Sequence, residues 1–268
     1  MQLKRATEVC DPRGYSMSTR VLSALRSPAL YPELRGARVL LTGLTSERGY
    51  DIARSFADAG CRLIIHTAEQ NATTDAMLEL LAASDSDVAA LHEPLTSNDA
   101  GIRLAQSAAQ AFGGVDCVIN LIETPAQPLS ADADYDDIET LVSSTLGPAC
   151  LVTRVTANRM RTTWVEGLIL NVLTADAPIN AAEATLQALL RQALAAMTRG
   201  EASARAADGI RINAVAPLGA SFDGRSAPDV LSSEPDIAAL ALHLASRRGE
   251  NLTGVVFDAA GVASRRCR

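Results

Sequence analysis

Short apolar runs alternate with alanine-rich amphipathic stretches from Arg38 onward, and this alternation constrains the fold more than any other feature of the sequence. Continuous apolar runs are typical of strands buried on both faces of a parallel sheet. Their separation by helical stretches predicts strand–helix–strand units. The seven runs comprise residues 39–41, 63–65, 88–91, 117–119, 168–172, 210–215 and 255–257. We therefore predict an α/β fold of three layers, with a doubly wound, parallel, seven-stranded sheet in the middle.

The first 35 residues differ from the rest of the chain. They show no sustained periodicity and contain Pro12, Pro28 and Pro32, which predicts an irregular N-terminal arm over residues 1–35. The remainder, residues 36–268, is interrupted by neither an internal repeat nor a low-complexity tract. We expect it to form a single domain, since this length is ample for one buried core.

The composition excludes several classes of protein. The net charge is -7 and the arginines are scattered, so we expect no nucleic-acid partner. No uncharged apolar stretch reaches the roughly 18 residues of a membrane span, and no signal-peptide core is visible. The cysteines form no CxxC pair, which argues against a metal site and a disulfide framework: Cys10, Cys61, Cys117, Cys150 and Cys267. The composition predicts a cytoplasmic protein with reduced thiols.

Two helices have distinct sequence signals. Ser233, Glu234 and Pro235 are typical of a helix start, and the helix is predicted to continue through Leu244. A second helix, from Ala181 to Arg199, has an apolar face that either packs on the core or forms a helix–helix subunit interface: Leu186, Leu189, Leu190, Ala193, Leu194 and Met197. Residues 200–208, which follow it, are interpreted as an insertion before the sixth strand.

A glycine-containing turn over residues 42–49 follows the first strand and opens the first helix. Backbone N–H groups in such a turn can bind a pyrophosphate. We expect Asn120 to end the fourth strand. Together with Asn120 and the segments 209–217 and 252–254, this turn makes the chain similar to the short-chain dehydrogenase/reductase family. The resemblance extends from about Arg38 to Gly261 and implies a Rossmann-like fold.

The resemblance also implies where a nicotinamide dinucleotide would bind. The corresponding positions are Gly43, Ser46, Gly49 and Asn120. Several neighbouring positions depart from the family pattern. Glu47 replaces a glycine of the turn, Thr67 replaces the aspartate of NAD-preferring members, Pro94 replaces an adenine-contacting aspartate, and Glu123 replaces a glycine that lines the cleft. A carboxylate repels a pyrophosphate, and Arg48 would offset this repulsion only if it turned inward. We therefore expect dinucleotide binding to be weak or absent, with no preference for NAD or NADP assigned.

The family's catalytic set is Asn, Ser, Tyr and Lys, in which the tyrosine transfers the substrate proton and the lysine lowers the pKa of the tyrosine. The resemblance places four other residues there: Ser144, Thr174, Ile179 and Glu183. A shift in the alignment restores neither the tyrosine nor the lysine, because no lysine follows Lys4 and no tyrosine follows Tyr135. Only the hydroxyl at Thr174 is retained, and three other acids are weaker candidates for a proton donor: Tyr50, Asp176 and Glu183.

Three hypotheses about function follow. The first is a catalytically inactive member of the family that acts as a structural or regulatory subunit. It would form a homo- or hetero-oligomer through the helix from Ala181 to Arg199, for example with an active member of the same family. The second is an NAD(P)-dependent oxidoreductase that uses Thr174 and a non-standard proton donor. The third is a regulatory protein that senses a dinucleotide without turning it over.

Overall fold

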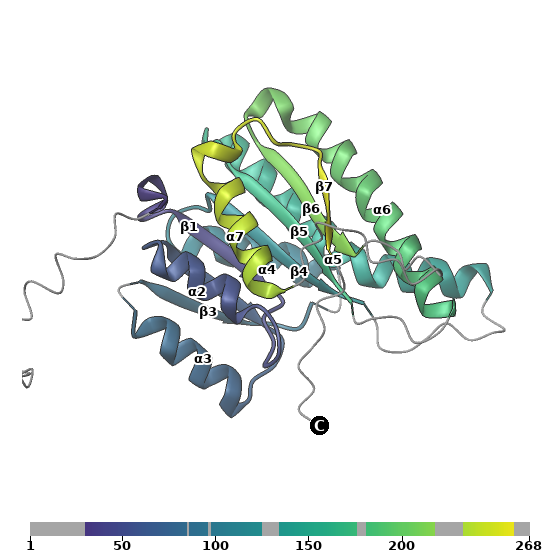
Figure 1. Ribbon diagram of the computed structural model, residues 1–268, viewed down its shortest axis with the longest axis horizontal. Helices are drawn as coiled ribbons and strands as arrows, with labels where there is room; N and C mark the ends of the chain where they lie inside the picture. Colours follow the sequence, from purple (N-terminus) through teal and green to yellow (C-terminus); the bar gives the residue numbers. More distant parts are fainter. Residues whose placement is uncertain are drawn as a thin grey trace, which may run out of the picture.

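A parallel sheet of seven strands lies at the centre of the protein (Figure 1). The computed structural model describes residues 30–84, 86–95, 98–124, 134–175, 181–217 and 233–259. The strand order is β3-β2-β1-β4-β5-β6-β7, and every adjacent pair is parallel. The strands are β1 (Arg38–Thr42), β2 (Arg62–Thr67), β3 (Val88–His92), β4 (Cys117–Glu123), β5 (Leu168–Thr174), β6 (Arg211–Pro217) and β7 (Val256–Ala259). The predicted fold class is confirmed.

Burial follows the position of each strand in the sheet. All seven residues of the interior strand β5 are buried, whereas the edge strand β3 has exposed residues. β4 is longer than its apolar run predicts: it continues past Asn120 to Glu123, and Glu123 pairs with Thr174 of β5. The prediction that Asn120 ends the fourth strand is therefore wrong, because the three residues after Asn120 keep the parallel pairing with β5.

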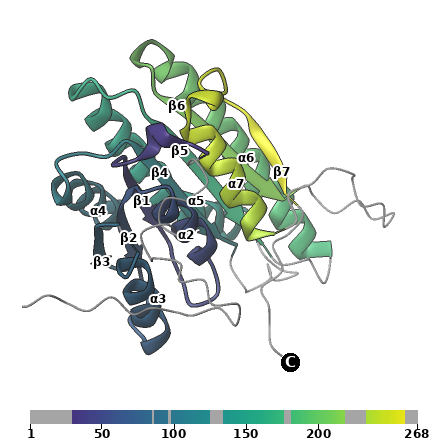
Figure 2. The same ribbon diagram turned by 60° about the vertical axis from the view of Figure 1, so that its left-hand side comes forward.

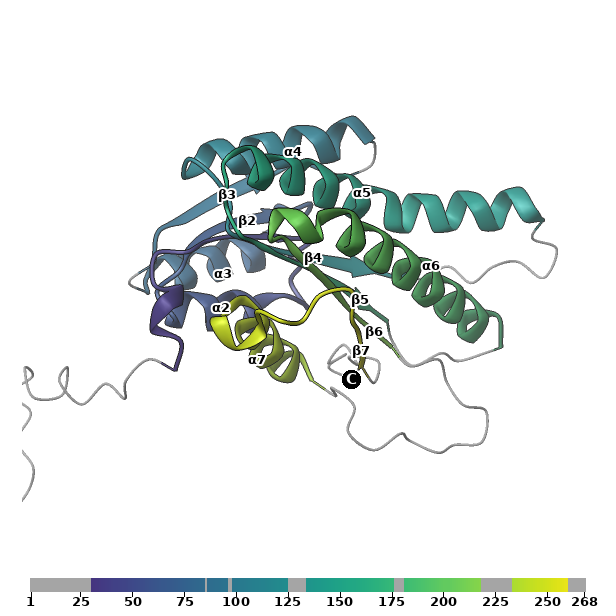
Figure 3. The same ribbon diagram turned by 90° about the horizontal axis from the view of Figure 1, so that it is seen from above.

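Helices cover both faces of the sheet and complete the three layers (Figure 3). One face carries α2 (Tyr50–Asp58), α3 (Ala72–Ala82) and α7 (Glu234–Ala245), and the other carries α4 (Asn98–Ala111), α5 (Tyr135–Thr162) and α6 (Ala181–Arg205). Figure 2 shows α2 and α7 side by side in front of the sheet. Residues of both helices belong to one apolar cluster with β1, β2 and β4. The helix predicted from Ser233 to Leu244 is confirmed as α7, with Ser233 at its N-cap.

The helix α6 is longer than the sequence predicts, since it ends at Arg205 rather than at Arg199. Residues 200–208, which were interpreted as an insertion, are helical: α6 continues through Arg205 and is followed directly by a 3₁₀ helix, η2 (Ala206–Asp208). Gly200 lies within α6 and does not end the helix, because the turns on either side of it are helical. On the predicted apolar face, the three leucines at 186, 190 and 194 are buried against the core, whereas Leu189 is 39% exposed.

Two of the segments on which the family resemblance rests, residues 209–217 and 252–254, contact each other beside β6. The buried Asn213 donates from Nδ2 to the carbonyl of Leu252 and accepts at Oδ1 from the N–H of Val255. The hydroxyl of Thr253 accepts from the N–H of Ile212. These contacts hold the turn that leads into β7, so this part of the resemblance serves the fold rather than a reaction.

The predicted N-terminal arm lies mostly outside the described residues. Its last part packs on the domain: η1 (Pro32–Leu34) places Leu34 in the core, and the guanidinium of Arg248 lies 5.4 Å from the ring centre of Tyr31. The boundary of the arm at residue 35 stays a prediction.

An ion pair and an exposed tryptophan lie at the end of the sheet that is formed by the amino ends of the strands. Arg38 and Asp116 form an ion pair there, with Nε and Oδ2 2.8 Å apart. Burial tends to raise the pKa of Asp116, but the hydrogen bonds from Arg38 outweigh this effect and lower it. The turn between α5 and β5 exposes Trp164, whose side chain is 93% exposed at a φ of 56°. It is the one tryptophan of the sequence.

Candidate cofactor cleft

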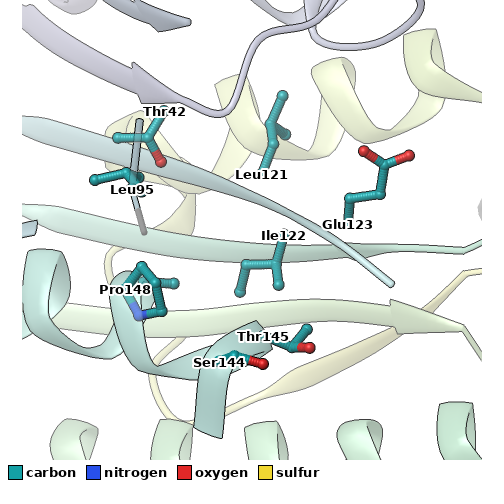
Figure 4. A pocket seen from close by; sticks show the side chains of 9 residues that line it. Thr42, Leu95, Leu121, Ile122, Glu123, Ser144, Thr145 and Pro148 are labelled. Atoms are coloured by element: carbon teal, nitrogen blue, oxygen red, sulfur yellow. The ribbon is translucent and has the colours of Figure 1, made fainter. Parts of the chain in front are cut away.

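The order of the strands predicts where a ligand would bind. The chain winds outward in one direction from β1 and in the other from β4, so the connections after these two adjacent strands diverge. Ligands of doubly wound sheets bind in the crevice at this point, beyond the carboxyl ends of the strands. A pocket of about 330 Å³ lies there (Figure 4), lined by Thr42, Leu95, Leu121, Ile122, Glu123, Ser144, Thr145, Pro148 and Ala149.

The glycines of the turn are needed for its shape. Gly43 has a φ of 79° and Gly49 a φ of 96°, both in the left-handed region that favours glycine. A Cβ on Gly43 would lie 2.5 Å from the carbonyl oxygen of Leu121, and one on Gly49 would lie 2.7 Å from a methyl carbon of the Leu121 side chain. Leu121 therefore packs closely over the turn, so these glycines accommodate a leucine of β4 in the present arrangement.

The backbone N–H groups of the turn have partners within the protein. They are bonded as follows: Gly43 to Nδ1 of His66 at 3.2 Å, Leu44 to the carbonyl of His66 at 3.1 Å, Thr45 to the carbonyl of Arg48 at 3.1 Å, and Ser46 to Oε2 of Glu69 at 3.4 Å. A pyrophosphate in this turn would have to replace such partners, and one of them is a carboxylate. Neither His66 nor Glu69 belongs to a motif of the turn, so the sequence pattern alone gives neither of them a role.

His66 connects the turn to the end of β3. Its Nδ1 accepts from Gly43, so its Nε2 carries the proton and donates to the carbonyl of Glu93 at 2.5 Å. The ring is 1% exposed, and this burial lowers the pKa of His66 below its ordinary value of 6.5. The neutral imidazole is therefore the form that fits, and a proton on Nδ1 would place two donors face to face.

We expect this histidine to make stability depend on pH. Because its folded pKa lies below its unfolded value of about 6.5, the neutral ring stabilises the fold fully above that value, and this contribution is lost as the pH falls from 6.5 toward the folded pKa. Urea unfolding from pH 7 down to about pH 5.5 should show a loss for the unaltered chain that is smaller in His66→Gln. His92→Gln, at an exposed position of β3, is the matched control. Equal pH profiles in all three chains would exclude the effect.

Asn120 is completely buried and lies in a polar cluster between β1, β4, β5 and α5. Its Oδ1 accepts from the Thr42 hydroxyl at 3.0 Å, and its Nδ2 donates to Oδ1 of Asn171 at 2.8 Å and to the Thr153 hydroxyl at 3.2 Å. The oxygen and the nitrogen of the Asn120 amide are therefore both hydrogen-bonded within the protein. The side chain that the resemblance implies as a cofactor contact thus joins three strands and a helix.

Arg48 turns inward, which the sequence left open. Its side chain is 8% exposed, and its Nη1 donates to the Thr174 hydroxyl at 3.0 Å and lies 3.2 Å from Oε1 of Glu123. The Thr174 hydroxyl donates in turn to the carbonyl of Ile122 at 3.2 Å. Arg48 therefore connects the glycine turn to the ends of β4 and β5.

Of the four positions that the resemblance places in the catalytic set, three lie within the described residues, and there the hydroxyls of Ser144 and Thr174 are bonded to different groups rather than to each other. Thr174 is bonded as above, Ser144 is exposed on α5 with its hydroxyl donating to the carbonyl of Leu141, and Glu183 lies partly buried in the first turn of α6. Figure 4 shows Ser144 on the helix that faces β4, with Glu123 at the end of that strand. Ile179 lies outside the described residues, as does Asp176.

As arranged, these residues do not fit a dinucleotide. The turn is surrounded by carboxylates from three segments, at Glu47, Glu69 and Glu123, and Arg48 is paired with the last of them. The N–H groups of residues 43–47 are bonded internally, and Leu121 covers the glycines of the turn. No group of three or more metal-ligating side chains occurs within the described residues either.

Comparisons with known proteins identify the class. A family model described as enoyl-(acyl carrier protein) reductase matches residues 43–222, more than half of the chain. The chain therefore belongs to the short-chain dehydrogenase/reductase family. It is similar to the A-factor type γ-butyrolactone 1′-reductase (1S-forming) of Streptomyces virginiae, with 26% identity over 80% of this chain and 90% of that protein. It is also similar to the L-rhamnose 1-dehydrogenase (NAD(P)(+)) of Azotobacter vinelandii, with 27% identity over 67% of this chain and 71% of that one.

Solved structures confirm the fold. A short-chain dehydrogenase from Burkholderia cenocepacia in complex with NADP has a TM-score of 0.68 to this chain, at 22% identity over 85% of this chain and 98% of the other. The family resemblance stated from the sequence is thus confirmed. In the part of the chain that the structure describes, no helix is both long and apolar enough to span a membrane.

Proposed function

We propose that this chain is a non-catalytic member of the short-chain dehydrogenase/reductase family that acts as a structural or regulatory subunit. One observation carries the proposal: Arg48 bridges Thr174 and Glu123 where the family's chemistry requires a hydroxyl that is available to a substrate oxygen. With Arg48 donating to it and the carbonyl of Ile122 accepting its proton, the Thr174 hydroxyl is engaged on both sides. The absence of any tyrosine after Tyr135 and any lysine after Lys4 points the same way.

The proposed subunit assembles through α6, as a homo- or hetero-oligomer. The observation that favours this helix is Leu189, which remains 39% exposed on a helix whose other leucines, Leu186, Leu190 and Leu194, are buried. We propose an active member of the same family as the partner in a hetero-oligomer. Two chains with the same fold can present equivalent helices to each other at such an interface.

A second candidate is an NAD(P)-dependent oxidoreductase that uses Thr174. The comparisons favour it over the first candidate, because the named relatives are a reductase and a dehydrogenase. A guanidinium does not give up its proton near neutral pH, so this candidate needs a proton donor other than Arg48.

A titration of NADH and NADPH into the purified chain, followed by nicotinamide fluorescence, distinguishes these candidates. We expect no saturable signal and no oxidation of either cofactor in the presence of a panel of activated ketones. Saturable binding with turnover that is lost in Thr174→Ala would replace the first candidate by the second. Saturable binding without turnover would instead identify a protein that senses the dinucleotide.

A further inference from the structure

The first turn of α2 is capped by a carboxylate from another helix. Oε1 of Glu234 accepts from the backbone N–H of Asp51 at 2.8 Å and from that of Ile52 at 3.3 Å. The N-cap residue of α2 is Gly49, which has no side chain with which to cap it. The first N–H groups of a helix have no partner within the helix, so a carboxylate at this place satisfies donors that would otherwise need water or a ligand.

The packing of α7 on α2 holds this carboxylate in place. Glu234 is the first residue of α7, and the N-cap of α7 is Ser233, whose hydroxyl accepts from the N–H of Asp236. Ile52 of α2 and Ile237 of α7 are both buried in the same apolar cluster. The position of Glu234 is therefore set by two packed helices rather than by a surface loop.

The charge of Glu234 matters because of where it lies. The amino end of a helix that follows a glycine turn favours an anion, through its N–H groups and its dipole. Glu234 supplies an anion from within the protein, and the N–H of Ser46 in the same turn donates to a second carboxylate, that of Glu69. A bound phosphate would have to approach both carboxylates and compete for donors that are already bonded.

We propose that Glu234 is an internal substitute for a ligand phosphate: it occupies the N–H donors at the start of α2, stabilises the turn without a ligand and excludes phosphate-type anions. Glu234 is thus an autoinhibitory contact built into the packing of α7 on α2. The inference deepens the proposed function, since it gives a physical cause for weak dinucleotide binding.

Inorganic pyrophosphate is the probe that tests this inference, because its binding does not depend on the catalytic positions. We compare four full-length chains at matched ionic strength: the unaltered chain, Glu234→Ala, Glu234→Gln and Asp236→Asn. The last removes an exposed carboxylate from the same turn of α7 and serves as the matched control. Glu234→Gln retains an acceptor but loses the charge, so it remains informative if the alanine variant folds poorly.

Without pyrophosphate, Glu234→Ala is expected to melt at a lower temperature than Asp236→Asn. In calorimetric titrations, both Glu234 variants are expected to bind pyrophosphate roughly 10-fold more tightly than the unaltered chain and the control. Equal pyrophosphate affinity in all four chains would overturn the inference, whatever the outcome with NADH and NADPH. Conversely, turnover by the unaltered chain would overturn the proposed function without affecting the pyrophosphate comparison.

Discussion

A chain carrying Ile179→Tyr and Glu183→Lys, in a background of Glu47→Gly, Glu123→Gly and Glu234→Gln, is expected to oxidise NADPH with an activated ketone at least about 100-fold faster than the unaltered chain. The two glycines remove carboxylates that repel a pyrophosphate, one of which holds Arg48 at the end of β4. The resemblance implies that the tyrosine supplies the proton donor and that the lysine, four positions later in the sequence, lowers the pKa of the phenol. The measurement is the initial rate of absorbance loss of NADPH at saturating ketone.

The matched control carries Ile179→Phe and Glu183→Gln in the same background. It has an aromatic ring and a neutral polar side chain at these positions but provides neither the phenol hydroxyl nor the cation, so we expect it to remain as slow as the unaltered chain. An equal gain in both chains would show that the carboxylates limit the rate of the unaltered chain, rather than its lack of a tyrosine and a lysine at positions 179 and 183. Rapid turnover by the unaltered chain would contradict the prediction directly.

Asn120→Leu is expected to destabilise the fold by about 2–4 kcal/mol. Leucine has a similar volume, but it removes the acceptor of the Thr42 hydroxyl and the donor to Asn171, and it leaves both groups buried. Buried polar groups without partners cost more than the net value of the hydrogen bonds that they formed. The free energy of unfolding in urea is the measurement.

The control for this prediction is Asn158→Leu, at an exposed position of α5. There the amide is free to exchange its contacts with water, so the same chemical change should alter stability by less than about 0.5 kcal/mol. A similar loss in both variants would mean that the cluster around Asn120 contributes little beyond a general cost of the substitution.

The order of strands and helices was predictable from the sequence because burial on both faces of a parallel strand requires continuous apolar residues, and these runs are visible at Val39 to Leu41 and at Leu168 to Val172. The ends of the strands were less predictable. β4 continues to Glu123 because hydrogen bonds to β5 do not depend on apolar side chains. The end of α6 was also not predicted, since its last turns contain Gly200 and Glu201 of the segment that was interpreted as an insertion.

The contacts around the glycine turn were not predictable from local patterns. Glu234 was recognised as part of a helix start, but its carboxylate serves a different helix, 182 residues earlier in the chain at Ile52. The inward position of Arg48 likewise depends on the ends of β4 and β5, which only the folded sheet brings next to the turn. Such partners are set by tertiary packing, so a sequence motif does not encode them.

The position of Trp164 determines how ligand binding to this protein can be observed. This tryptophan lies before β5, whereas the cleft lies beyond the other end of that strand. Seven residues of strand separate the two, which corresponds to roughly 23 Å at about 3.3 Å per residue. Because the indole is 93% exposed, its emission is already that of a solvated ring and will respond little to events in the cleft. A second tryptophan introduced at Leu95, in the wall of the pocket, would act as an optical probe there against a constant background.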